Sequence, residues 1–257
     1  MLEWFENESF WKETYDFLFP EKLFMDTRDQ IEKILQLVDV RGSCVLDLCC
    51  GPGRFSILLA ERGFAVTGVD RSPFLLDQAK MIEKSTDSPI DMIPVEWVLE
   101  DMRRFVRPSS YDLVLNMFTS FGYFEDKNED LTVLENIFTS LKPGGTLLID
   151  IMGKEILARI FQSSISTVLD DGTVVVQRPE IFDNWSRIRN DWTIIRGSRA
   201  TTFTFQHNIY SGQELKDRMS DAGFESIKLY GDLNGDPYDI SAKRLVITGI
   251  KPFGTMS

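Results

Sequence analysis

The sequence predicts an α/β fold in which parallel strands alternate with helices. Three observations predict it, and all come from the stretch Cys44–Asp70, CVLDLCCGPGRFSILLAERGFAVTGVD. Residues 44–48 form an apolar run with one acid, the pattern of a strand buried on both faces. A Gly-Pro-Gly turn and a helically spaced apolar segment follow. A second buried strand then ends in Asp70. Such a strand-turn-helix-strand unit binds a mononucleotide-like ligand at the carboxyl ends of its strands.

The glycine turn distinguishes three possible ligands. A triphosphate loop needs Gly-Lys-Ser/Thr at the start of the helix, but Gly53 is followed by Arg54. A dinucleotide fingerprint would tolerate Ser56 as its third small residue, but Asp47 at the end of the first strand would repel a pyrophosphate. A ligand with a sulfonium and an ammonium group would be attracted to the same acid. S-adenosylmethionine has both groups and no phosphate, so the turn favours it.

The stretch VLDLCCGPGRFSILLAERGFAVTGVDRS resembles motifs I and II of the class I S-adenosylmethionine-dependent methyltransferases. The resemblance implies a Rossmann-like seven-stranded methyltransferase sheet flanked by helices. It places Asp47 and Gly51 near the methionine portion of the cofactor and Asp70 on the ribose hydroxyls. The family's usual glycine two residues after the strand-end acid is Cys49 here. The cofactor-binding residues predicted from these two motifs are Asp47, Cys49, Gly51, Gly53, Asp70 and Arg71.

Length and charge limit the possible functions. The 257 residues are enough for a single methyltransferase domain, 1–257, that carries an insertion. A net charge of −12 argues against nucleic acid or an anionic membrane as a partner. The N-terminus has no basic region followed by an apolar core, and no window approaches the length of a membrane span. We therefore expect a cytoplasmic protein, either a monomer or a homodimer.

Cysteine and acid patterns argue against disulfides and metals. Cys44, Cys49 and Cys50 are crowded into one element, which predicts reduced, small buried residues. The loop GDLNGDPYDISAK superficially suggests a calcium site, but no glutamate follows at the twelfth position and no helix flanks it. We therefore expect no bound metal.

Residues 1–40 are predicted to form an N-terminal helical cap. Aromatic and acidic residues alternate in its first part, and Ile31, Ile34 and Val38 recur at helical spacing before the first strand. In many methyltransferases of the resembling family such a segment folds over the cofactor. The resemblance implies that Tyr15 reaches the carboxylate of the cofactor. Packing within the segment is the alternative role for each aromatic residue.

The alternation of strands and helices continues after Asp70. A capped helix and a polar loop at 85–94 lead to a third predicted strand, 95–99. Asp101 and Met102 follow it. The resemblance implies that the acid accepts a hydrogen bond from the adenine amino group and that its neighbour packs on the ring. The alternative for the acid is to cap the next turn.

Residues 111–118, YDLVLNMF, are predicted as the fourth strand. Asn116 is polar in an otherwise apolar strand, and an unpaired buried amide costs roughly 1–3 kcal/mol, so we expect it to contact the ligand. The run FTSFGYF that follows resembles a loop of small-molecule methyltransferases that lines the space between sulfonium and acceptor. Aromatic faces attract a sulfonium by about 1–2 kcal/mol when desolvated. Phe121 and Tyr123 are therefore predicted substrate-binding residues.

Residues 165–210 depart from the minimal fold. An Asp-Gly turn between β-branched runs, followed by an alternating strand pair, predicts an antiparallel β insertion between the fifth and sixth strands. This lobe would wall an acceptor pocket or make a subunit contact. It contains His207, the one histidine of the chain and a predicted substrate-binding residue. His207 is a natural base for a hydroxyl or ammonium acceptor, although such a residue on a strand is often structural.

The predicted function is transfer of a methyl group from S-adenosylmethionine to a small-molecule acceptor at N, O or C, with S-adenosylhomocysteine as product. The chemistry needs an in-line approach and a base only for a protonated acceptor, so no acceptor motif is expected. Arg54 opposes the helix dipole and would be explained by a carboxylate of cofactor or substrate, or by a surface acid. The alternatives are a protein or RNA methyltransferase and a non-catalytic cofactor-binding subunit.

Overall fold

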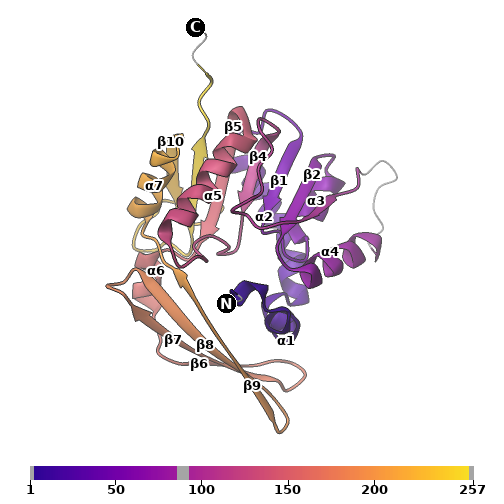
Figure 1. The fold of residues 1–257 in the computed structure, drawn as a ribbon, viewed down its shortest axis with the longest axis vertical. Helices are drawn as coiled ribbons and strands as arrows, with labels where there is room; N and C mark the ends of the chain where they lie inside the picture. The colour runs from indigo at the N-terminus through magenta and orange to yellow at the C-terminus, as the bar shows by residue number, and fades with distance from the viewer. Residues whose placement is uncertain (1–2, 86–92, 255–257) are drawn as a thin grey trace.

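The computed structural model describes residues 3–85 and 93–254. Most of the predicted loop at 85–94 lies outside these described residues. Helices and strands alternate along the first part of the chain (Figure 1).

Seven strands form one sheet in the order β10-β11-β5-β4-β1-β2-β3. Neighbouring strands are parallel except that β11 runs antiparallel to both β5 and β10. The order reverses between β1 and β4, the place where open α/β sheets bind ligands. The predicted seven-stranded sheet is thereby confirmed. Its strands are β1 Cys44–Leu48, β2 Ala65–Asp70, β3 Glu96–Leu99, β4 Tyr111–Asn116, β5 Leu141–Ile151, β10 Glu225–Tyr230 and β11 Leu245–Ile250.

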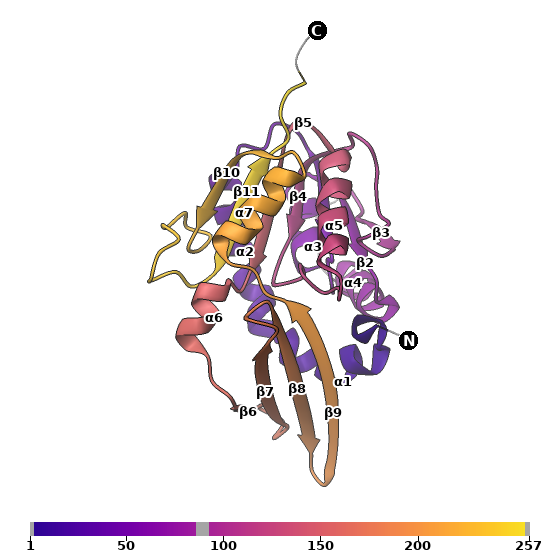
Figure 2. The same ribbon diagram turned by 60° about the vertical axis from the view of Figure 1, so that its left-hand side comes forward.

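Helices cover both faces of the sheet (Figures 1 and 2). Successive strand residues point to opposite faces, so Val45 of β1 packs with α2 and α3, whereas Leu46 packs with α5 and α7. These two apolar layers make a core that holds the strand ends rigidly. The helices that build the layers, with α4 beside β3, are α2 Glu21–Leu37, α3 Arg54–Glu61, α4 Pro73–Ser85, α5 Lys127–Ser140 and α7 Gly212–Asp221.

The segment before α2 lies beyond the carboxyl ends of the strands. It contains the 3₁₀ helix η1 Trp4–Glu6 and the helix α1 Glu8–Leu18, drawn in indigo in Figure 1. The Glu8 carboxylate accepts hydrogen bonds from the Ser72 hydroxyl at 2.8 Å and from the Phe74 backbone N–H at 3.0 Å. Because both donors belong to the start of α4, these bonds fix α1 next to the end of β2. We call residues 3–19 the cap segment.

A separate antiparallel sheet follows β5 and the short helix α6 Lys154–Ile160. Its order is β6-β7-β8-β9, and it extends away from the main sheet (Figure 2). The predicted antiparallel insertion between the fifth and sixth strands of the main sheet is confirmed, with four strands. We call it the lobe, and its strands are β6 Ile165–Val168, β7 Val174–Phe182, β8 Arg187–Arg196 and β9 Arg199–Asn208.

Buried polar groups hold the end of the lobe against the main sheet. Asp130 of α5 is fully buried and accepts hydrogen bonds from Asn208 Nδ2 at 2.8 Å and from the Tyr210 hydroxyl at 2.6 Å. Burial raises the pKa of Asp130 to about 6. The backbone N–H of Asn208 also donates to the Gly122 carbonyl at 2.7 Å. The exit of β9 is therefore fixed to α5 and to the loop after β4.

Candidate functional site

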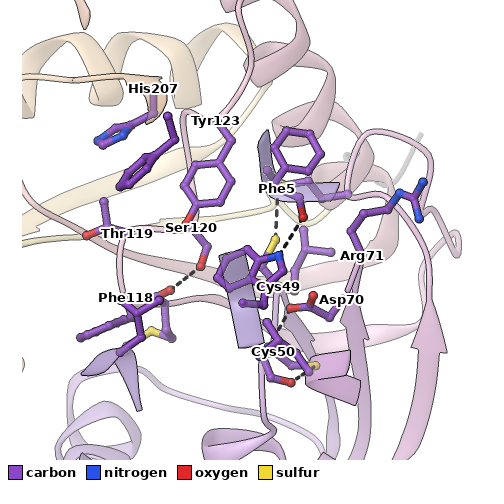
Figure 3. Close-up of a pocket in the computed structure, with 18 of the residues that line it drawn as sticks. Phe5, Cys49, Cys50, Asp70, Arg71, Phe118, Thr119, Ser120, Tyr123 and His207 are labelled. Atoms are coloured by element: carbon purple, nitrogen blue, oxygen red, sulfur yellow. Dashed lines mark hydrogen bonds between the residues drawn. The ribbon is translucent and has the colours of Figure 1, made fainter. Parts of the chain in front are cut away.

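A cavity of about 530 Å³ lies between the carboxyl ends of the strands, the cap segment and the lobe. Most of the predicted site residues line it, although they come from segments far apart in the sequence. Figure 3 shows Asp70 and Cys49 toward one end, Tyr123 in the middle and His207 at the other end. The predicted site residues that line the cavity are Asp47, Cys49, Gly51, Asp70, Arg71, Asp101, Met102, Tyr123 and His207.

The turn after β1 is shaped by residues with positive φ. Gly51 has φ 55° and Gly53 has φ 76°, values that glycine adopts without strain, whereas Cys49 adopts φ 63° despite its side chain. A Cβ on Gly53 would lie 2.4 Å from the Trp97 ring, so this glycine lets the helix start pack on the sheet rather than facing the cavity. Gly51 lines the cavity itself. The two predicted glycines thus have different structural roles.

Asp70 fixes the glycine turn. One carboxylate oxygen accepts the Gly51 N–H at 2.8 Å, and the other accepts the Ser72 N–H at 2.9 Å. Burial raises the pKa of Asp70 to about 6. Each oxygen keeps a second lone pair, so the side chain can accept two further hydrogen bonds from vicinal hydroxyls. Arg71 lines the cavity next to it and pairs with Glu6 of the cap segment at 2.5 Å.

Asp47 and Asn116 lie at the ends of the two strands where the order reverses. Asp47 is 1% exposed and accepts the Ser56 hydroxyl at 2.6 Å, and burial raises its pKa to about 6. Asn116 is fully buried and does not line the cavity. Its Nδ2 donates to the Leu48 carbonyl at 3.1 Å, while its Oδ1 is buried without a partner. Asn116 therefore joins β4 to the end of β1 behind the cavity surface.

Asp101 and Met102 lie after β3, at the end of the cavity beyond Asp70. The Asp101 carboxylate is held by Arg103, whose Nη2 lies 2.6 Å away and whose backbone N–H donates at 2.8 Å. Arg103 also binds Glu3 of the cap segment at 2.9 Å and Glu129 of α5 at 2.8 Å. The Met102 sulfur lies 3.4 Å from the Cys49 sulfur. This corner of the cavity combines the acids Glu100 and Asp101 with a soft apolar surface, which suits a purine with an exocyclic amino group.

Two of the predicted aromatic residues do not reach the cavity. Tyr15 is half-buried and packs against Phe19 and Phe74. Phe121 is 1% exposed and packs against Tyr210 in the core. The cap segment instead contributes other aromatic side chains, from Trp4 to Phe19. The alternation of aromatics in this segment predicts a contact surface, but nothing in the sequence indicates which rings face inward.

The loop after β4 explains why Phe121 turns away. β4 ends at Asn116, two residues before the predicted end, because Phe118 and Thr119 adopt φ 59° and 62°. Gly122, with φ 99°, changes the chain direction again. These turns send Phe121 into the core and leave Tyr123 on the cavity, so strict alternation along the loop is lost.

Arg54 lines the cavity, whereas the sequence alone leaves its partner open. It is 5% exposed, and its Nη1 donates to Thr27 Oγ1 at 3.0 Å and to Gln30 Oε1 at 2.9 Å. Burial lowers the pKa of Arg54 to about 10, so it is charged at neutral pH. Among the residues that the structure describes, no carboxylate lies within ion-pair distance of it. In the sequence, the position of Arg54 in the first turn of a helix, where a cation opposes the helix dipole, indicates that this side chain has a special role.

The wall opposite the strand ends is aromatic. Phe10 of the cap segment packs against Phe203 and Phe205 of the lobe, with ring centroids 5.6 and 5.3 Å apart. His207 follows on the same face of β9, and its ring centroid lies 6.3 Å from that of Tyr123. Burial lowers the pKa of His207 to about 4, so its imidazole is neutral at neutral pH. The cap segment and the lobe together close the cavity from outside.

The sheet order and the position of the cavity define the class of protein. A seven-stranded sheet with one antiparallel strand, and strand-end acids on β1 and β2 beside a glycine turn, is the arrangement expected of a Rossmann-like methyltransferase. Comparisons with known proteins agree. A family model described as "Methyltransferase domain" matches residues 45–145.

Relatives and solved structures extend the match beyond these residues. A protein of Geobacillus sp. (strain WCH70) that carries a provisional methyltransferase name is 29% identical over 96% of this chain and 99% of its own. The ubiquinone biosynthesis O-methyltransferase of Pseudomonas entomophila is 27% identical over 72% of this chain and 76% of its own. An S-adenosylmethionine-dependent methyltransferase from Clostridium acetobutylicum shares the fold, with a TM-score of 0.78 at 14% identity over 95% of this chain and 98% of its own.

Residues 45–145 match a methyltransferase domain, and the chain is similar over most of its length to methyltransferases, which supports a methyltransferase enzyme. Within residues 3–85 and 93–254, no helix is long and apolar enough to cross a membrane. The same described residues contain no group of three or more histidine, cysteine or acidic side chains placed to hold a metal ion.

Proposed function

We propose that the protein transfers the methyl group of S-adenosylmethionine to a small-molecule acceptor inside the cavity. The observation that carries this proposal is that acidic and aromatic residues lie on opposite sides of the cavity. Acids that suit adenosine and an ammonium group lie at the strand ends, and an aromatic wall from the cap segment and lobe faces them. A cavity of about 530 Å³ has the size typical of small-molecule sites.

The cofactor would lie along the strand ends. Asp70 would accept the ribose hydroxyls, and Asp101 with Met102 would hold the adenine at the end of β3. Asp47, next to the reversal of strand order, would attract the ammonium group of the methionine portion. Arg54, a buried cation without an ionic partner among the described residues, would hold the methionine carboxylate. Bound there, S-adenosylmethionine supplies an electrophilic methyl group.

The acceptor would occupy the remaining space between Tyr123 and the aromatic wall. Its nucleophilic atom must approach the methyl group in line with the breaking bond, and the closed walls restrict that approach. The relative from Pseudomonas entomophila, whose name describes an O-methyltransferase of ubiquinone biosynthesis, supports a small acceptor. The net charge of −12 and the enclosed wall weigh against RNA or a folded protein as acceptor.

A labelling experiment tests the proposal. Purified protein is incubated with S-adenosylmethionine labelled in its methyl group and with a pool of small metabolites, and in parallel with RNA and with total protein. We expect label in a small molecule alone. Label in RNA or in protein would contradict a small-molecule acceptor and identify that macromolecule as the acceptor instead. Cofactor binding without transfer to any fraction would favour a non-catalytic subunit.

A further inference from the structure

The cap segment and the lobe line the cavity with uncharged side chains. Among the described residues, every charged side chain in the lining comes from the ends of strands in the main sheet or from the segments next to them. The cap segment contributes only apolar and aromatic side chains. Burial lowers the pKa of His207 to about 4, so it is neutral as well. We call the lining residues of the lobe the lobe wall, and they are Gln177, Ile188, Asn190, Trp192, Phe205 and His207.

The pleat of the lobe separates its amides from neighbouring charges. Gln177 of β7 and Asn190 of β8 line the cavity. Arg178 and Arg189, next to them in the sequence, are exposed and take no part in the lining. Successive strand residues point to opposite faces, so these two charges lie on the face of the lobe away from the cavity. The polar groups that the lobe wall offers to a ligand are therefore neutral amides.

The two amides of the lobe wall are free to bind a ligand. Both side chains are half-buried, and among the described residues neither amide has a hydrogen-bond partner. In the register of the sheet, Gln177 lies opposite Trp192 and Asn190 lies opposite Pro179. Gln177 and Asn190 are thus diagonal neighbours on one face, with their Cα atoms roughly 7–8 Å apart. One polar group of a ligand can lie between them.

The charged residues of the lining already have partners or belong to the cofactor end. Arg244 forms an ion pair with Asp150 at 2.7 Å, and its Nη2 donates to Thr119 Oγ1 at 3.0 Å. Arg71 pairs with Glu6 of the cap segment. Under the proposed function, the remaining charged residues hold the cofactor or lie at its adenine end. No charged side chain of the described lining is left over as the ionic partner of an acceptor.

Such a lining disfavours a charged acceptor. A buried ammonium group needs a carboxylate, and a buried carboxylate needs a cation, because desolvation otherwise outweighs binding. Each amide instead offers two donors and one acceptor oxygen, which match a carbonyl, a hydroxyl or another amide. The rings of Phe10 and Phe205, with centroids 5.3 Å apart, suit the apolar ring of a ligand.

Resting on the proposed function, we infer that the methyl acceptor is an uncharged molecule with an apolar ring and a neutral polar group, and that Gln177 and Asn190 bind this polar group. The aromatic side chains of the cap segment and of the lobe wall enclose the ring. The two amides therefore determine the specificity for the acceptor, whereas the strand ends hold the cofactor.

The acceptor class is tested with three probes that share one ring system. They are 2-naphthamide, the similarly shaped anion 2-naphthoate, and 2-(aminomethyl)naphthalene, which is an ammonium at neutral pH. Calorimetry on the full chain saturated with S-adenosylhomocysteine should show 2-naphthamide binding at least about tenfold more tightly than either charged probe. Tighter binding of a charged probe, or no binding of 2-naphthamide, overturns the inference. Failure of S-adenosylhomocysteine itself to bind would instead overturn the proposed function.

The role of the amides is tested by removing them one at a time. Gln177→Leu and Asn190→Leu should each weaken binding of 2-naphthamide about threefold to tenfold, because a hydrogen bond is lost. Neither should weaken binding of 2-methylnaphthalene, which has no polar group. Gln206→Leu, on β9 outside the lining, is the matched control and should change neither affinity. An unchanged affinity for S-adenosylhomocysteine shows that each variant is folded. Equal losses for both probes, or no loss for 2-naphthamide, would overturn the role of the amides.

A change of charge at Asn190 gives a test by gain of binding. Asn190→Asp keeps the size of the side chain but places a carboxylate in the lobe wall. It should raise the affinity for 2-(aminomethyl)naphthalene by at least about fivefold and lower that for 2-naphthoate, because an ammonium group then gains a charge-assisted partner. Calorimetry with the same two probes measures both changes. Wild-type affinities for both probes in this variant would show that Asn190 does not contact the acceptor.

Discussion

Arg54 is a buried cation without an ion-pair partner among the residues that the structure describes. Its guanidinium donates hydrogen bonds to the neutral oxygens of Thr27 and Gln30. It lies 4.2 and 5.1 Å from the ring centroids of Phe55 and Phe118. Replacing it with methionine should weaken binding of S-adenosylmethionine by about 1.5–3 kcal/mol, because a charge-assisted pair with the methionine carboxylate is lost.

A truncated ligand separates this role of Arg54 from a structural one. 5′-Methylthioadenosine lacks the amino acid portion, so its affinity should be the same in wild type and Arg54→Met. Calorimetry with both ligands makes the comparison. Arg107→Met, at an exposed ion pair with Glu96, should change neither affinity. Equal losses for both ligands in Arg54→Met would show that Arg54 only supports the fold.

Asp70 couples cofactor binding to pH. Its pKa is raised to about 6, and the ionised carboxylate that holds the glycine turn accepts stronger hydrogen bonds from ribose hydroxyls than the protonated acid does. Affinity for S-adenosylhomocysteine should therefore fall as pH drops through about 6, which calorimetry at pH 5, 6 and 7.5 would detect. Asp70→Asn should bind about 10-fold to 100-fold more weakly at pH 7.5, with a shallower pH dependence.

The contribution of Asp70 to the free energy of unfolding changes with pH in the opposite direction to the cofactor affinity. The pKa of Asp70 in the folded protein lies above the ordinary value of 3.8, so this contribution is fully present below pH 3.8 and is lost as pH rises through about 6. The free energy of unfolding and the cofactor affinity should thus move apart between pH 4 and 6. The same affinity at pH 5 and 7.5 would contradict an ionised Asp70 in the complex.

At the scale of elements, the lobe depends on its attachment through Asp130. Asp130→Ala removes the hydrogen bonds to Asn208 and Tyr210 in a fully buried place, so the free energy of unfolding should fall by about 2–4 kcal/mol. Tyr210→Phe removes one of these bonds and should cost about 1 kcal/mol. Urea denaturation measures both. A loss below about 0.5 kcal/mol in Asp130→Ala would contradict the attachment, by the usual scale of surface substitutions.

Local signals in the sequence predict elements better than they predict contacts between elements. The glycine turn and the acids Asp47 and Asp70 follow directly from the strand pattern, and the structure places them around one cavity. The orientation of Phe121 depends on positive φ values in its loop, which no side-chain pattern announces. Trp4 contacts Phe205 only because the cap segment and the lobe close over the sheet. Tertiary packing between segments far apart in the sequence decides such contacts, so the local sequence pattern does not predict them.

At the scale of the whole molecule, the sheet provides the rigid strand ends and two separate segments provide the opposite wall. Glu13 of the cap segment binds both Arg196 and Arg199 at the β8–β9 turn, so the cap and the lobe are joined to each other as well as to the sheet. The cavity that they enclose is lined largely by apolar and aromatic side chains. Binding should accordingly bury apolar surface and give a negative heat-capacity change.

The most direct measurement is titration calorimetry of the full chain with S-adenosylhomocysteine, with NAD as the control nucleotide. We predict one site per chain with a dissociation constant on the order of micromolar, and a melting temperature that rises with ligand concentration. NAD should give neither heat nor a thermal shift, because the strand-end acid Asp47 repels its pyrophosphate. Heat and stabilisation from NAD, with none from S-adenosylhomocysteine or S-adenosylmethionine, would contradict the account.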